Sequence, residues 1–198
     1  MKKLSKKSVL LFASVMALCA FAMPSMASAA SWGTINTNHV LDSPDLAFNA
    51  PLLGGGSSCA NSSFNTDVRS AAVLTVTSGT FTNCSGTGGN ANCAVTVTPT
   101  GFPWLGTGVS QTDLRIDRVN IDVVFNGPAP CAVPGVKISL TGTLGTGAAS
   151  ESAWDVLAHQ VTLTNTHGLT AHVVGTATSV PTTVNGRIRD TAQTLTLT

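Results

Sequence analysis

The sequence predicts an all-β fold, either an antiparallel β-sandwich or a barrel with Gly- and Pro-rich loops, preceded by a cleaved signal peptide. Three observations support this prediction. Thr, Val, Gly and Ser dominate the chain after residue 30, and this composition disfavours helices and suits strands joined by glycine turns. Several short segments alternate apolar and polar side chains, as strands with one buried face do. Charged residues make up only 10% of the 198 residues, which excludes a basic nucleic-acid binder and a salt-bridged helical protein.

The N-terminal segment has the features of a secretory signal peptide. Four lysines among the first seven residues precede a mostly apolar run over residues 9–22, and Ala27-Ser28-Ala29 provides a small-residue cleavage site. The run is short for a membrane span. Cleavage after Ala29 leaves six basic and nine acidic residues, a net charge of −3. We therefore expect a secreted or cell-surface protein, extracellular or periplasmic, with no membrane span once the signal is removed.

Four cysteines remain after cleavage: Cys59, Cys84, Cys93 and Cys131. An even number in an exported protein indicates two disulfides. Four cysteines allow three connectivities, and we favour Cys84–Cys93 with Cys59–Cys131, because a turn-rich loop lies between Cys84 and Cys93. The alternative is a zinc site, but the sequence contains no Cys-x-x-Cys spacing and no histidine close to a cysteine.

The alternating segments define the expected elements in chain order. Residues 30–58 read as an N-terminal strand and an irregular lead-in, and residues 59–198 as a single all-β domain. One strand should end at Ser78-Gly79, and another should stop at Pro99. Residues 148–159, with Glu151 near the start, are the best candidate for a helix. Strands are predicted over residues 34–41, 71–77, 94–98, 136–144, 161–164, 169–178 and 194–197.

The segment from Asp113 to Phe125 changes phase. Leu114 and Ile116 share one parity, whereas Val119 and the apolar residues that follow it share the other. A flat strand cannot keep both sets on one face, because a shift of one residue turns every side chain over. The simplest solution is a β-bulge near residues 117–118. A turn there that gives two short strands is the alternative.

An aromatic corner is predicted at Thr98-Pro99-Thr100-Gly101-Phe102-Pro103-Trp104. Two prolines and a glycine so close together exclude a regular central strand. One interpretation is a rigid corner whose Phe102 and Trp104 plug one end of the core. The other is an exposed aromatic platform, where Phe102 and Trp104 contact an apolar ligand or a partner.

The residues that carry chemistry form no recognisable catalytic or metal-binding motif. His39, His159, His167 and His172 fall in no metal-ligand or nucleophile pattern, and a metal site from His167 and His172 is a weak alternative. A calcium site from the aspartates between residues 113 and 122 lacks the glycine turn of an EF-hand loop. No Gly-x-Ser-x-Gly elbow and no basic-aromatic patch for nucleic acid occur. We expect no catalytic residue, no metal and no cofactor.

The order of several features resembles the PraB-like family, the protein activators of alkane oxidation. Cys59 precedes Ser78-Gly79-Thr80-Phe81-Thr82, then follow Cys93, the Pro99-to-Trp104 motif and Cys131. The similarity covers roughly residues 55–145. Cys84 and the segments 86–92 and 148–154 depart from the pattern. The resemblance implies exported β-rich proteins of bacterial surfaces and biofilm matrix, linked to growth on hydrocarbons. It implies no catalytic residues.

Two functions from different classes are therefore expected. The first is a non-enzymatic surface or extracellular-matrix protein, whose partners are itself, through a strand edge such as residues 193–198, or other matrix components. The alternative is a binding module for an apolar small molecule such as an alkane or lipid. The scarcity of aromatic residues, 5% of the chain, favours the first. A dispersed hydrolase site is a third hypothesis, supported only by the histidines and aspartates present.

Overall fold

The computed structural model describes residues 30–33, 35–127, 131–147 and 151–198, and the expected signal peptide at residues 1–29 lies outside them. The described chain is all-β, with a short 3-10 helix η1 at Pro51–Leu53. The strands are β1 (Thr37–Ser43), β2 (Leu46–Ala50), β3 (Gly55–Val68), β4 (Leu74–Gly88), β5 (Ala94–Thr100), β6 (Trp104–Ser110), β7 (Asp113–Asn126), β8 (Lys137–Leu144), β9 (Ser152–Asp155), β10 (Gln160–Val173) and β11 (Ser179–Asp190).

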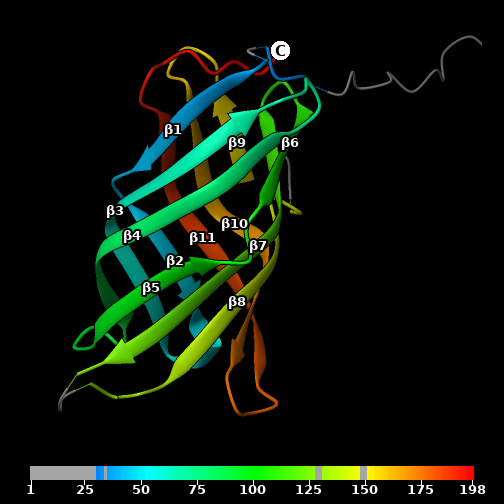
Figure 1. Ribbon diagram of the computed structural model, residues 1–198. Coiled ribbons are helices and arrows are strands. Elements are labelled where there is room, and N and C mark those ends of the chain that lie inside the picture. The colour runs from blue at the N-terminus through cyan, green and yellow to red at the C-terminus, as the bar shows by residue number, and fades with distance from the viewer. Residues whose placement is uncertain (1–29, 34, 128–130, 148–150) are drawn as a thin grey trace, which may run out of the picture.

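The strands close into an antiparallel barrel (Figure 1). Ladders join β2, β3, β4, β5, β7, β8, β10 and β11 in that order, and a ladder between β11 and β2 completes the ring. We call each of these eight positions in the ring a wall. Walls that follow one another along the chain are neighbours in the ring, which is the up-and-down arrangement. Eight walls enclose an interior just wide enough to be filled by side chains or to hold one small ligand.

Three of the eight walls consist of two short strands in line. β1 and β2 both pair with β3 and β11, β6 and β5 both pair with β4 and β7, and β9 and β8 both pair with β7 and β10. The first break contains Pro44 and the second contains Pro103, and proline has no N–H to donate to a ladder. The breaks fall partway along the barrel, so each of these walls is irregular in its middle and regular at its two ends.

Apolar side chains point into the barrel and form one continuous core. The chain after residue 29 contains eight aromatic residues, and seven of them are buried. Only Phe102 is partly exposed, and it packs against the core. Polar side chains, mostly Thr, Ser and Asn, cover much of the outer face, as the strand alternation predicts.

A cap, formed by residues 30–33 and 191–198, closes one end of the barrel. Ser31 N donates to Thr198 O at 2.7 Å, Thr198 N donates to Ser31 O at 2.9 Å, and Trp32 forms a bridge with Leu197. Trp32, Leu195 and Leu197 are fully buried. The alternation predicted for residues 194–197 is thus real, but this segment seals the barrel and makes only an isolated bridge.

Several expected boundaries are wrong for identifiable reasons. β4 continues past Ser78-Gly79, where a Cβ on Gly79 would lie 2.6 Å from the Phe64 ring, so the glycine makes room for that ring. β5 continues through Pro99 to Thr100. The segments 161–164 and 169–178 belong to one strand that ends at residue 173, with bulges inside it. No division occurs at residue 59, because β1 and β2 are walls of the same barrel and β3 spans residues 55–68.

The helix expected over residues 148–159 is wrong where the structure describes it. Ser152–Asp155 form β9, which pairs with β10, and Glu151 directly precedes this strand; residues 148–150 lie outside the described residues. Ser152 and Trp154 are buried on one side of β9 with a period of two. The phase slip in β7 is resolved as predicted by a bulge: the register with β8 shifts between Ile116 and Val119, and Arg118 has a φ of 62°.

The four cysteines form two disulfides, but the favoured connectivity is wrong. The bonds are Cys59–Cys84 and Cys93–Cys131. Cys59 and Cys84 are direct cross-strand partners on β3 and β4, with Cα atoms 4.0 Å apart. The second bond ties the start of β5 to the loop between β7 and β8. Two disulfides indicate an oxidising, extracytoplasmic environment.

Candidate functional site

The barrel interior contains a central apolar cavity of about 50 Å³. Phe48, Phe64, Phe81 and Trp104 line one side, and aliphatic side chains of the remaining walls line the rest. Among the described residues, no polar side chain lines it. Empty cavities of this character stay dry, because water needs polar partners, and they bind small apolar molecules.

Two smaller cavities continue the central one along the barrel. A cavity of about 30 Å³ lies beneath the cap and is lined by Trp32, Trp154 and Leu195. Another of about 20 Å³ lies toward the opposite end, against Phe48 and Phe125. The cavity beneath the cap shares aliphatic lining residues with the central cavity, and the third cavity shares Phe48 with it. Single side chains therefore separate the three spaces.

A seam between β4 and β5 interrupts the barrel wall beside the central cavity. The β4–β5 ladder contains the pair Ser85–Ala94, and β4 next pairs with β6 at Val76–Trp104. Between these two points β4 is laddered only to β3, and β5 only to β7, within the described chain. Because Pro99 lies in this part of β5, its missing N–H is accommodated where no β4 ladder exists.

Five aromatic rings pack against one another, and one of them, Phe81, belongs to the part of β4 that borders the seam. Phe48 and Phe64 contact Phe81 edge-on, with ring centroids 5.6 and 5.4 Å apart. Phe64 also lies 6.1 Å from Trp104, and Trp104 stacks on Phe102 at 4.7 Å. The five rings form a continuous apolar path from the partly exposed Phe102 to the central cavity.

The sequence-predicted pair, Phe102 and Trp104, is therefore brought together, although neither forms an exposed platform. Trp104 is 4% exposed, lines the central cavity, and donates its indole N–H to Thr100 O at 2.9 Å. The rigid-corner interpretation agrees with this burial. The corner lies partway along the wall, however, whereas the prediction placed it at one end of the core.

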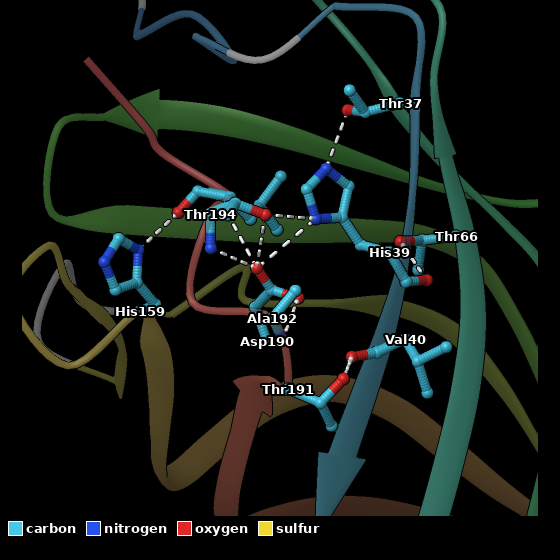
Figure 2. Close-up of polar contacts among 10 residues, drawn as sticks. Thr37, His39, Val40, Thr66, His159, Asp190, Thr191, Ala192 and Thr194 are labelled. Carbon is cyan, nitrogen blue, oxygen red and sulfur yellow. Dashed lines mark hydrogen bonds and ion pairs between the residues drawn. The ribbon is translucent and has the colours of Figure 1, made fainter.

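A polar cluster, which sequence reasoning missed, holds the cap on the barrel (Figure 2). His39 Nδ1 lies 3.3 Å from Asp190 Oδ2, and His39 Nε2 lies 2.7 Å from Thr37 Oγ1. The His39 and Asp190 side chains are almost completely buried. His159 adds a contact between its Nδ1 and Leu195 O at 2.8 Å.

The Asp190 carboxylate accepts hydrogen bonds from the cap backbone. Ala192 N, Thr194 N and Leu195 N donate to it at 3.3, 2.7 and 2.8 Å. Burial alone would raise the pKa of Asp190, but these three N–H groups and the nearby His39 hold the pKa below its ordinary value of 3.8. The carboxylate is therefore an ionised anchor for the turn that starts the cap.

The order hydroxyl, imidazole, carboxylate at Thr37, His39 and Asp190 is also that of a nucleophilic triad. A catalytic triad needs a space beside the nucleophile where a reacting carbonyl can sit. None of the three interior cavities is lined by these residues. Because Asp190 holds three cap amides, a structural role explains the cluster.

The other sequence candidates have separate partners. Asp113 accepts from Ser110, Asp117 pairs with Arg115, and Asp122 pairs with Lys137. His167 pairs with Glu151, while His172 contacts Ser179. No group of three or more metal-ligating side chains occurs among the described residues.

The structure supplies two further observations about this chain. In its described part, no helix has the length and apolar character needed to cross a membrane. The cavity and the seam depend on residues from almost every wall, which no local motif in the sequence could have revealed.

No protein-family model, curated protein or solved structure matches the chain.

Proposed function

We propose that this chain is a non-enzymatic, exported barrel that binds a small apolar molecule, such as a short alkane, in its interior. The observation that carries the proposal is the central cavity, whose walls are wholly apolar and which the aromatic path connects to the surface at Phe102. The disulfides and the expected signal peptide support export. The scarcity of aromatics no longer counts against binding, since nearly all of them lie inside.

The size of the cavity limits the ligand. An engineered apolar cavity of about 150 Å³ binds benzene or xenon, whereas the central cavity measures about 50 Å³. An atom of xenon is therefore a suitable first probe. A longer alkane needs the side chains between the three cavities, the shared aliphatic ones and Phe48, to change rotamer and join the spaces. Each Å² of apolar surface that the ligand buries contributes about 25 cal/mol.

The test is xenon binding to the oxidised chain from Ala30 onward, measured by xenon NMR, followed by n-hexane. Val184 lines the central cavity, so Val184→Phe fills it and should abolish saturable binding. Val180 lies on the same strand, is also buried, and lines none of the interior cavities, so Val180→Phe is the matched control. Equal xenon binding by both folded variants would refute an interior site.

A second candidate is a self-associating surface or matrix protein linked to growth on hydrocarbons. Leu157 and Leu52 are 93% and 74% exposed, and they lie at opposite ends of the barrel, in the β9–β10 turn and in η1. Association between ends agrees with this exposure, whereas the segment expected to add as an edge strand, residues 193–198, is held in the cap. Sedimentation velocity should then show concentration-dependent oligomers that Leu157→Ser reduces. A monomer at all concentrations would remove this candidate.

A further inference from the structure

A polar groove lies on the outer face of the barrel, where β1 ends and β2 begins. Its volume is about 240 Å³, several times that of the apolar cavity inside. The break after Ser43 creates it: β1 pairs with β3 up to Ser43–Ser62, and β2 resumes the pairing at Leu46–Cys59. Between these pairs the wall bends around Pro44, which also lines the groove.

Cross-strand neighbours form the wall of the groove in a continuous row. Asp42 on β1 faces Arg189 on β11 and Ser63 on β3, and Ser63 in turn faces Thr80 on β4. Asn61 and Thr82 form a parallel pair one step further along β3 and β4. Register places these groups on one surface, because directly opposed residues point to the same side of a sheet.

The groove contains hydrogen-bonding groups that the protein leaves unused. Asp42 and Arg189 are direct neighbours of opposite charge, yet neither side chain has a hydrogen bond or ion pair within the described chain. These two charged side chains are therefore available to a ligand that lies in the groove.

The lining is chemically uniform in a way that indicates one class of ligand. Five of its residues carry hydroxyls, although Ser43 and Ser62 are buried, one carries an amide, and the two charges cancel. The exposed part of the groove therefore presents donors and acceptors with no net charge. Pro44 is the sole apolar member among the lining residues that the structure describes. A polyhydroxylated neutral molecule matches these features, because a carboxylate can accept from two adjacent hydroxyls while a guanidinium donates to a third.

We propose that this groove binds a neutral saccharide unit, with Asp42 and Arg189 as its charged contacts. The site is separate from the apolar interior and does not depend on the function proposed for it. The expected affinity for a single sugar is weak, with a Kd of about 1 mM, as befits a shallow surface site with few contacts. A linear oligosaccharide that follows the row of strands should bind more tightly.

The experiment is a backbone amide NMR titration of the oxidised chain with D-glucose, with maltotetraose and, for comparison, with zwitterionic glycine. Glucose should shift the amides around the groove saturably, and maltotetraose should do so at lower concentration. Asp42→Asn keeps the shape and removes the charge, and it should weaken glucose binding about tenfold, as the loss of a charged hydrogen bond does. Asp122→Asn, on the outer face of β7 and paired with Lys137, is the control.

Two results would overturn the proposal. One is the absence of saturable shifts with either sugar, or shifts confined to residues outside the groove. The other is a response to glycine without a response to glucose, which would assign the groove to charged ligands. Retained glucose binding in a correctly folded Asp42→Asn variant, measured beside the Asp122→Asn control, would exclude Asp42 from the site. Hexane and xenon binding should be unaffected by Asp42→Asn, so the two proposals fail independently.

Discussion

Replacing Asp190 with asparagine should loosen the cap and destabilise the barrel. The carboxylate is fully buried, accepts three backbone hydrogen bonds and contacts His39. Asparagine has the same shape but only one acceptor oxygen, so its amide N–H₂ must face one of these donors. Hydrogen bonds to a charged group contribute about 1.5–3 kcal/mol each, and breaking a buried pair costs about 3–5 kcal/mol. We expect a loss of about 3 kcal/mol.

Chemical denaturation at neutral pH measures this loss, and thermal unfolding should show a decrease in Tm of about 10 °C for a chain of this size. The same carboxylate sets a pH dependence. Because its pKa is lower in the folded state than its ordinary value of 3.8, its contribution is complete above that value and is lost as the pH falls through the lower folded pKa. The Asp190→Asn variant should lack this acid-dependent component.

Asp122→Asn provides the matched control, since the Asp122–Lys137 pair is partly exposed and should contribute no more than about 1 kcal/mol. The reasoning would be refuted if Asp190→Asn unfolded within about 0.5 kcal/mol of the original chain, the usual range for surface substitutions. Hydrogen exchange at Leu195 and Leu197 locates the effect: these amides should lose protection first.

Two more outcomes follow from the fold. Peptide mapping without reduction should recover Cys59–Cys84 and Cys93–Cys131, and recovery of Cys84–Cys93 would contradict the strand register. Removing the second bond should lower the unfolding free energy slightly more than removing the first, by about 4 against 3.5 kcal/mol, because it closes a chain loop of 38 rather than 25 residues. Arg118→Gly should raise the unfolding free energy by about 1 kcal/mol, because a φ of 62° is strained by about that much for any residue with a side chain and is unstrained for glycine. A loss of stability in equilibrium denaturation would instead mean that the exposed Arg118 side chain makes a stabilising contact.

The sequence predicted those features that depend on one strand at a time. Alternation identified the all-β class and located the bulge in β7, because a change of parity is visible in the residues themselves. The sequence pattern gave wrong predictions where pairing with another strand determines the structure. Residues 152–155 have no strong strand signal and become β9 through pairing with β10. Cys84 lies nearer to Cys93 in the chain, but the β3–β4 register places Cys59 directly opposite it.

The candidate sites illustrate the same limit. Phe102 and Trp104 could be singled out because the prolines around them mark a corner. The remaining cavity lining looks like ordinary core in the sequence. His39 and Asp190 are 151 residues apart, and Asp42 and Arg189 are 147 apart, so only the closure of the barrel brings each pair together.

The wall order of the barrel has a consequence for how the chain folds. Almost every ladder joins neighbours in sequence, so hairpins can form locally and early, with little loop-closure entropy to overcome. The exception is the joint of the barrel, by which we mean the ladders of β1 and β2 with β11. These ladders can form only when the two ends of the described chain meet. The cap, the His39–Asp190 contact and the polar groove all lie along this joint. We expect these contacts to form after the transition state, so substitutions there should accelerate unfolding while leaving the folding rate nearly unchanged.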